Sequence, residues 1–186
     1  MCLYPKLILN RKYLPNKKNG GKPEKIKDER TRYVPVGCGK CMECMRQKAR
    51  GWQVRLHEEI RNNNNGKRFV TLSFNDKSLN ELGEEVEKIR LDTIANINAT
   101  KTNKSYSKKY KPMDSYKLDN EIATLATRRF LERWRKKYKV SVKHWLVTEL
   151  GETGTERIHI HGILFTNETT ETIEQIWKYG NIWIGD

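Results

Sequence analysis

Apolar and polar residues alternate along four stretches of the chain, which is the period-2 pattern of a half-buried strand. The four stretches are residues 67–74, 142–149, 157–165 and 182–184. In the third stretch Ile158, Ile160 and Leu164 fall on one face, so His159 and His161 share the opposite face. Residues 32–36 are expected to form an edge strand, because Pro35 has no N–H to donate to a central ladder.

Apolar residues at helical spacing predict helices at residues 41–62, 118–138 and 169–178, and a shorter helix near 80–97. The first 36 residues look mostly irregular, and residues 98–117 are expected to be an exposed loop. The order of these elements indicates an α+β fold with a central, mostly antiparallel sheet that is flanked by helices. The strands at 142–149 and 157–165 are expected to form a hairpin in that sheet.

Basic residues are unevenly distributed along the 186 residues, whose formal net charge is +14. Residues 1–50 hold 14 Lys and Arg against 4 Asp and Glu. We expect this part to be a basic, Cys-rich N-terminal arm that includes the start of the first helix and packs on the same domain. Residues 51–186 then form the main domain, with a Lys-rich insertion at about 76–117. No closing element follows the strand at 182–184, so we expect a fragment of a longer protein.

This charge distribution indicates an anionic polymer as the partner, most often nucleic acid, although charge alone does not separate DNA from RNA or from a membrane surface. The basic end of the helix at 118–138 can lie along DNA phosphates, or it can be a solvated face. Tyr106 and Tyr110 belong to a Lys-rich loop that could stack on single-stranded bases, or that is a solvated insertion. The candidate DNA-binding residues are Arg128, Arg135, Lys136 and Arg157.

The sequence contains no apolar run that reaches the ~18 residues needed to span a membrane. Its first residues lack the apolar core and the cleavage site of a signal peptide. We therefore expect an intracellular protein without a membrane partner.

Three cysteines, Cys38, Cys41 and Cys44, follow a C-x2-C-x2-C spacing, and Cys2 is the remaining cysteine of the sequence. Four thiolates suffice for a tetrahedral zinc site, whose role is structural because a closed site leaves no coordination position open. Cys2 would fold back onto the other three and fix the N-terminal arm. An iron–sulfur cluster and four unliganded thiols are the alternatives.

The histidine pair indicates a second metal site. Two imidazoles side by side on a strand form a metal-binding edge, and Glu149 ends the preceding strand of the hairpin, so the three groups can converge. Two imidazoles and a carboxylate with open coordination positions suit Mn²⁺ or Mg²⁺, which could polarise a phosphodiester in a basic protein. The alternative is a pair of partly buried histidines with hydrogen-bond partners.

The stretch from Ile158 to Gly162 resembles the His-hydrophobic-His motif of the HUH endonucleases, which are rolling-circle replication initiators and relaxases. Residues 69–74 are similar to the first motif of those initiators, and Glu149 matches the place of their third metal ligand. A narrower resemblance, to the replication initiation protein of gokushoviruses, single-stranded DNA phages of the microvirus family, is carried by residues 36–41, 50–52, 69–72 and Cys2. The insertion at 76–117 has no part in it.

This resemblance implies a ferredoxin-like or RRM-like fold and a metal held by Glu149, His159 and His161 on the scissile phosphate. It also implies attack by a tyrosine, which leaves a 5′-phosphotyrosyl link and a free 3′-OH. The implied partners are single-stranded DNA at a replication origin and the host replication machinery, in the cytoplasm of a bacterial host.

The family's tyrosine lies on a helix after the histidine motif, in a Tyr-x-x-Lys pattern. Tyr179 does not fit this pattern, and Tyr106 has the spacing but precedes the histidine strand. We therefore assign no nucleophile within the chain and expect it beyond residue 186. Two other functions remain open: a non-catalytic, zinc-stabilised nucleic-acid-binding module, and a metal-dependent RNA or phosphate-ester hydrolase that forms no covalent intermediate.

Overall fold

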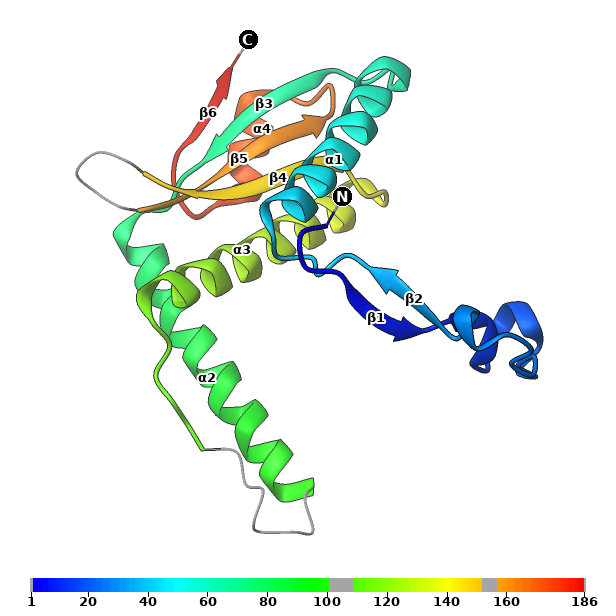
Figure 1. Ribbon diagram of the computed structural model, residues 1–186. Coiled ribbons are helices and arrows are strands. Elements are labelled where there is room, and N and C mark those ends of the chain that lie inside the picture. The colour runs from blue at the N-terminus through cyan, green and yellow to red at the C-terminus, as the bar shows by residue number, and fades with distance from the viewer. Residues whose placement is uncertain (1, 101–108, 152–156, 186) are drawn as a thin grey trace. The chain divides into compact units, whose positions relative to one another are not determined.

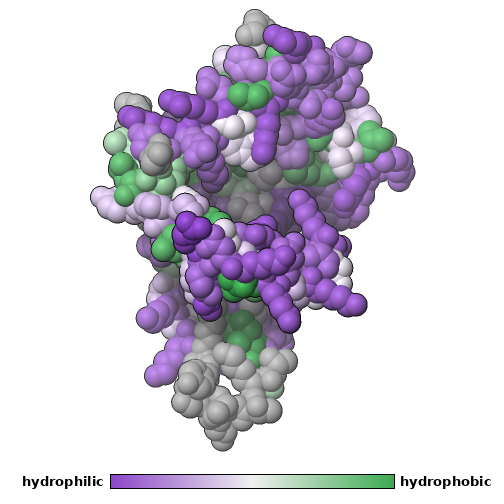
Figure 2. Space-filling model, turned by 45° about the vertical axis from the view of Figure 1, so that its right-hand side comes forward, coloured by the Kyte–Doolittle hydropathy of each residue, from purple (hydrophilic) through white to green (hydrophobic). Residues whose placement is uncertain are grey.

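The chain contains two antiparallel sheets, a two-stranded one near the N-terminus and a four-stranded one formed by strands between residues 67 and 185 (Figure 1). The structure is a computed structural model that describes residues 2–100, 109–151 and 157–185. The chain divides into two compact units, residues 1–62 and residues 63–186. None of the described helices combines the length and the apolar character needed to cross a membrane. Figure 2 shows a visible surface that is mostly hydrophilic, with hydrophobic residues in small separate patches.

The first unit pairs β1 (Lys6–Leu9) with β2 (Tyr33–Val36), and Pro35 lies opposite Leu7. In a sheet of two strands each strand is an edge, so a proline is tolerated there. Three 3-10 helices lie between the strands: η1 (Arg11–Tyr13), η2 (Lys17–Asn19) and η3 (Glu29–Thr31). The edge strand expected at 32–36 is therefore confirmed, whereas β1 and the 3-10 helices fall in a segment that was expected to be irregular.

Helix α1 (Met42–Asn62) follows β2 in the same unit and confirms the helix expected from about residue 41. It runs without a break through the expected boundary between residues 50 and 51. The described part of the arm and this helix belong to one compact unit.

The second unit is built on a sheet of four strands in the order β4–β5–β3–β6, with every neighbouring pair antiparallel. The strands are β3 (Lys67–Leu72), β4 (Lys143–Leu150), β5 (Ile158–Phe165) and β6 (Ile182–Gly185). The antiparallel sheet and the β4–β5 pairing confirm the predicted α+β class and the predicted hairpin. Residues 152–156, in the loop of that hairpin, lie outside the described residues.

This unit has three helices: α2 (Asp76–Thr100), α3 (Ser115–Tyr138) and α4 (Thr170–Trp177). Helices α3 and α4 pack on the sheet, and α2 packs mainly against α3. Helix α2 is longer than the helix expected at 80–97. The Asn75 side chain accepts a hydrogen bond from the Ser78 N–H (2.8 Å) at its start, and Leu82 and Val86 are buried in the core. The first part of the expected insertion is therefore part of the folded core, while Tyr106 lies outside the described residues.

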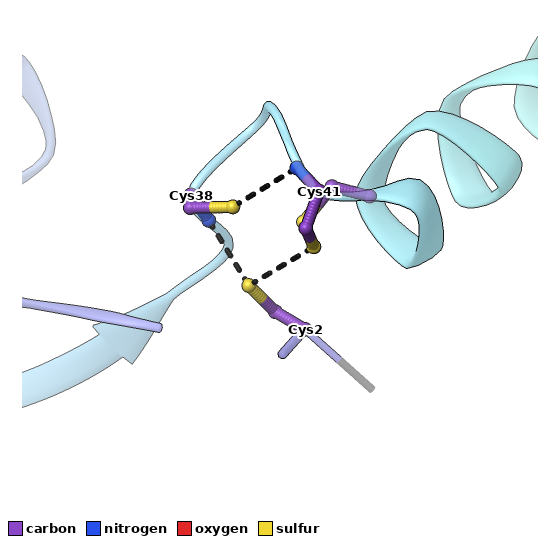
Figure 3. Close-up of side chains that lie close together, drawn as sticks. Cys2, Cys38 and Cys41 are labelled. Carbon is purple, nitrogen blue, oxygen red and sulfur yellow. Dashed lines mark hydrogen bonds between the residues drawn. The ribbon is translucent and has the colours of Figure 1, made fainter. Parts of the chain in front are cut away.

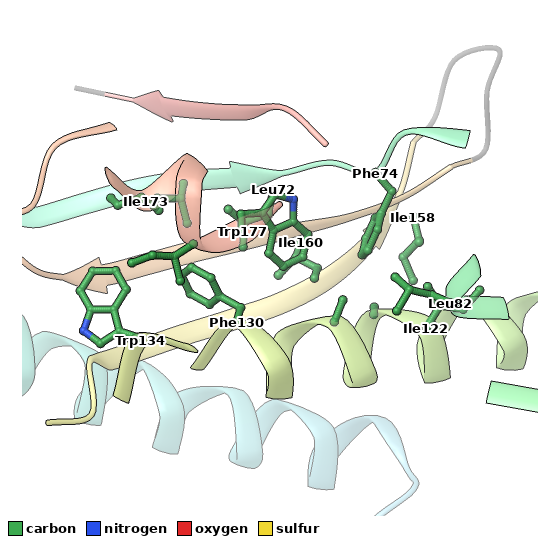
Figure 4. Close-up of a cluster of buried hydrophobic side chains, with 14 of the residues drawn as sticks. Leu72, Phe74, Leu82, Ile122, Phe130, Trp134, Ile158, Ile160, Ile173 and Trp177 are labelled. Carbon is green, nitrogen blue, oxygen red and sulfur yellow. The ribbon is translucent and has the colours of Figure 1, made fainter. Parts of the chain in front are cut away.

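Alternate residues of the strands point into one hydrophobic core between the sheet and the helices (Figure 4). Trp177 is fully buried at its centre, in edge contact with Phe74 and Phe130, and its indole N–H donates to the Ser73 carbonyl at 2.8 Å. The helices thus cover one face of the sheet. The strand residues of that face are buried: Val70, Leu72, Ile158, Ile160 and Leu164.

Candidate functional site

The face of the sheet opposite the helices carries the predicted metal ligands. On β5 the residues at 158, 160 and 164 are buried, whereas His159 and His161 are only half-buried on the other face. Glu149, on β4, is paired with His159 across the two strands and is exposed. Residues directly opposite on an antiparallel pair have Cβ atoms about 4.5–5.5 Å apart. The hairpin therefore brings all three predicted ligands to one open face, as the alternation of residues predicted.

Two of the three side chains, His161 and Glu149, are in contact, and His159 is the neighbour of both on this face. The Nε2 atom of His161 lies 3.5 Å from a carboxylate oxygen of Glu149. The imidazole centroids of His159 and His161 are 6.2 Å apart, with the ring planes tilted by 33°. Two imidazole nitrogens and one carboxylate oxygen are a donor set that divalent metals accept, so the residue types fit the metal that was expected here. The three ligand atoms do not all lie within 4.8 Å of one another, so binding of the metal would require the side chains to move closer together.

Thr71 orients the ring of His161. Its hydroxyl lies 2.9 Å from His161 Nδ1, and the two residues are paired across β3 and β5. In the tautomer in which Nδ1–H donates to Thr71, the Nε2 lone pair is left free on the side of Glu149. A hydrogen bond of this kind to the second ring nitrogen is the usual way in which a metal-binding histidine is fixed. The alternation of residues in β3 predicted the face on which Thr71 lies. It did not predict the contact with His161, because that contact depends on how β3 pairs with β5.

Gly162 holds β5 close to β4. A Cβ atom at this position would overlap the Trp145 carbonyl oxygen and would lie 2.8 Å from the Leu146 Cα. Both are backbone atoms, which cannot move aside as a flexible side chain can. The glycine that follows the histidine pair is therefore required by the close approach of the strands.

The four cysteines form a second candidate site within the first unit. Their sulfur atoms all lie within 4.8 Å of one another, and they are the one group among the described residues in which three or more potential ligand atoms come this close. The Sγ atoms of Cys2 and Cys41 are 3.7 Å apart (Figure 3). In a tetrahedral site with Zn–S bonds of about 2.3 Å, the sulfur atoms are about 3.8 Å apart. The cluster therefore has the size of a zinc site and could bind such a metal.

Backbone N–H groups surround this cluster. The N–H groups of Cys44 and Leu3 donate to Cys41 and lower its pKa to about 6. The Gly39 N–H favours the thiolate of Cys44, but the neighbouring thiol of Cys2 and burial outweigh it and raise the pKa of Cys44 to about 12. Cys2, near the start of the chain, accepts a hydrogen bond from the Cys38 N–H at 3.2 Å. Cys2 is thus folded back onto the C-x2-C-x2-C run, as expected if four cysteines form one site.

The basic residues expected to contact DNA do not lie together. Arg128, Arg135 and Lys136 are on α3, which packs on the covered face of the sheet, away from the histidines. Arg128 lines a pocket of 490 Å³ between α2 and α3, and Lys136 is paired with Glu132. Arg157 directly precedes the histidine strand and is paired with Asp76 at 2.6 Å. Of the four residues, Arg157 is the one next in sequence to the histidine strand.

Tyr179, the tyrosine that follows the histidine strand, belongs to the other side of the sheet. Its hydroxyl accepts a hydrogen bond from Arg133 at 3.0 Å, and its ring packs against Phe74 and Trp177 of the core. This position agrees with the mismatch between Tyr179 and the family's tyrosine pattern. Within the part of the chain that the structure describes, no hydrogen bond or ring contact joins a tyrosine to Glu149, His159 or His161.

Comparison with known proteins identifies a family. Searches of curated proteins and of solved structures give no significant match. Residues 67–186 match the model of the family described as replication-associated protein ORF2. The matched region is well over half of the chain and contains the whole four-stranded sheet with Glu149, His159 and His161. The chain therefore belongs to the family of the replication-associated protein ORF2.

Proposed function

We propose that the chain is a rolling-circle replication initiator of the HUH endonuclease type, which nicks and rejoins single-stranded DNA at an origin. The observation that carries this proposal is the grouping of Glu149, His159 and His161 on the open face of the sheet. The membership in a replication-associated family, which implies an interaction with DNA, supports it. Residues 51–186, with the ferredoxin-like arrangement, are the proposed nuclease domain.

The chain's own residues hold and orient the reacting phosphate. Glu149, His159 and His161 would hold Mn²⁺ or Mg²⁺, with Thr71 fixing the ring of His161. When bound, the metal supplies Lewis-acid polarisation of a non-bridging phosphate oxygen. Arg157 directly precedes β5, and it would contact the DNA backbone by exchanging its ion pair with Asp76 for one with a phosphate.

The proposed reaction is a transesterification. A tyrosine hydroxyl, which we expect to lie after residue 186, attacks phosphorus, and the bond from phosphorus to the 3′-oxygen breaks. The hydroxyl proton passes to the departing 3′-oxygen, directly or through water. The products are a 5′-phosphotyrosyl link and a free 3′-OH, and the reverse attack by a 3′-OH rejoins the strand.

A covalent-adduct assay tests this function. The chain, and a version extended past Asp186, are mixed with a labelled single-stranded origin oligonucleotide and Mn²⁺, and the adduct is resolved under denaturing conditions. We expect an adduct with the extended protein and none after His161→Ala. His144→Ala is the matched control, because His144 is an exposed histidine on β4 that points away from the metal ligands and contacts the Val142 carbonyl.

Binding of the oligonucleotide by the extended protein without formation of an adduct would refute the proposal. Binding alone would favour a zinc-stabilised nucleic-acid-binding module, and strand cleavage without an adduct would favour a metal-dependent hydrolase. We further propose that the cysteine cluster holds structural zinc and that the protein acts in the cytoplasm of a bacterium infected by a gokushovirus-type phage, together with host replication proteins.

A further inference from the structure

Two large aromatic side chains are exposed on the open face of the sheet, in addition to the metal ligands. Trp183, on β6, is 61% exposed, and Phe69, on β3, is 41% exposed. Both share a face with Thr71: Trp183 is its partner across β3 and β6, and Phe69 is two residues before it. Soluble domains rarely leave a tryptophan and a phenylalanine side by side in water without a use for them.

The rings of Phe69 and Trp183 are neighbours of the histidines on this face. The centroids of Phe69 and His161 are 6.4 Å apart with ring planes only 22° from parallel, and those of Phe69 and Trp183 are 6.5 Å apart with planes near perpendicular. The ring of Phe69 is therefore a neighbour of both the proposed metal ligand His161 and the indole of Trp183. A ligand that contacts the two aromatic rings reaches the metal ligands without leaving the face of the sheet.

Gly185 leaves room for the indole of Trp183. A Cβ atom at Gly185 would lie 2.8 Å from the far edge of the indole and 3.5 Å from the Phe69 ring. The side chain of Trp183 is thus folded over β6 toward Phe69. The core does not need either ring, because the opposite face of the sheet already buries Phe130, Trp134 and Trp177.

We propose that Phe69 and Trp183 form a stacking platform for unpaired bases of single-stranded DNA, which places the backbone of the strand at His161 and Glu149. This inference rests on the proposed function, because it uses the same face of the sheet. Each base presents an apolar π-face that stacks on an aromatic ring whatever the sequence. A duplex hides those faces in its own stack, so the platform selects unpaired strands.

The charge of the chain favours DNA over other occupants of this face. The formal net charge is +14, which attracts a polyanion and opposes the association of a second copy of the chain. Arg157 directly precedes β5, two residues before His159, and its guanidinium is paired with Asp76 at 2.6 Å. A DNA phosphate would have to displace the Asp76 carboxylate in order to contact Arg157.

A binding experiment without metal tests the platform separately from the chemistry. Binding of a fluorescently labelled single-stranded oligonucleotide is measured by anisotropy in EDTA, at several salt concentrations, for the wild type and for Trp183→Ala and Phe69→Ala. Stacking of one base contributes about 1–3 kcal/mol by alanine substitution, so each variant should bind about 5- to 160-fold more weakly. The dependence of affinity on salt should not change, because neither ring contacts a phosphate.

Tyr116→Ala is the matched control, since Tyr116 is 59% exposed but lies on α3, on the other side of the sheet. It should bind like the wild type, and Trp183→Phe should retain most of the affinity because it keeps an aromatic face. Circular dichroism and thermal unfolding check that Trp183→Ala folds, which we expect because the side chain of Trp183 is exposed.

Equal affinity of Trp183→Ala and Tyr116→Ala would overturn the platform, and so would a loss in Trp183→Ala that Trp183→Phe shares in full. Loss of self-association in Trp183→Ala, with DNA affinity unchanged, would instead identify a second copy as the occupant. These results are independent of the covalent adduct: an adduct with unchanged Trp183→Ala binding refutes the platform alone. Weaker Trp183→Ala binding without any adduct refutes the nicking function alone.

Discussion

Replacing Thr71 with valine should weaken metal binding at the histidine pair while the fold is retained. Valine has nearly the same shape as threonine and suits a β-strand, but it has no hydroxyl. The hydrogen bond of 2.9 Å to His161 Nδ1 is then lost, and nothing fixes the rotation of the imidazole toward Glu149. The perturbation therefore acts on the orientation of one proposed ligand and leaves all three ligands in the chain.

The expected size of the effect follows from two separate contributions. Removing the partner of a metal-binding histidine typically costs about 10- to 100-fold in metal affinity or activity. One hydrogen bond contributes about 1 kcal/mol to folding, and His161 is partly exposed, so water can replace part of the lost bond. Metal affinity should therefore fall much further than thermal stability, which we expect to change by about 2–4 °C.

Titration calorimetry with Mn²⁺ measures the affinity, and the covalent-adduct assay measures its consequence. Thr71→Ser keeps the hydroxyl and should restore most of the affinity. Ser73→Ala is the control for a lost hydroxyl nearby, because Ser73 donates to the Asn181 carbonyl at 2.8 Å and does not contact a ligand. It should lower stability by a similar amount without changing Mn²⁺ binding.

Mn²⁺ affinity in Thr71→Val equal to that of the wild type would refute this role of the hydroxyl. An equal loss of affinity in Thr71→Ser and Thr71→Val would refute it as well, because the methyl group and not the hydroxyl would then matter. The chemical shifts of the His161 ring nitrogens provide a further check, since a merely structural role of Thr71 would leave the tautomer unchanged.

Three further predictions concern the frame around the site and the cysteine cluster. Gly162→Ala should destabilise the second unit by about 3 kcal/mol, measured by urea unfolding, because the new Cβ would meet backbone atoms of β4; an unchanged midpoint would contradict the close approach. Cys38→Ser should reduce the zinc content of the purified protein from about one ion per chain to nearly none by metal analysis, whereas Met42→Ser, at an exposed position beside the cluster, should not. Lys139→Gly should raise thermal stability slightly, by about 0.5 kcal/mol, because Lys139 ends α3 with φ of 61°, a left-handed conformation that favours glycine; a lower melting temperature would contradict this.

The period of the hydrophobic pattern was sufficient to predict the face on which the proposed site lies. Alternation in β5 separated Ile158 and Ile160 from His159 and His161, and the structure buries the first two residues and leaves the histidines half-buried. The hairpin between β4 and β5 could also be predicted, because a short polar turn joins two strand patterns. The sequence also placed Glu149 at the end of the preceding strand, and the register of the structure pairs it with His159.

Features that depend on pairing between distant strands could not be predicted in the same way. Thr71 and His161 are 90 residues apart in sequence, and only the register of β3 on β5 places them together. The same holds for Phe69 and Trp183, which meet because β6 pairs with the outer edge of β3. Strand β1 has a different cause: it is too short to show a period, so its pairing with β2 leaves no local signal.

The two faces of the sheet carry different kinds of residue, and the strand pairing at Gly162 determines which residues lie on which face. The covered face is fixed by packing, since its strand residues are buried against α3 and α4, whereas the open face is free to carry histidines, a carboxylate and exposed rings. A shift of β5 by one residue would exchange the faces and drive His159 and His161 into the core. The close contact at Gly162, directly after His161, can form at one register only, because any other residue of β5 brings a Cβ against the β4 backbone. The glycine therefore secures the position of the proposed metal ligands through the strand pairing, without contacting them.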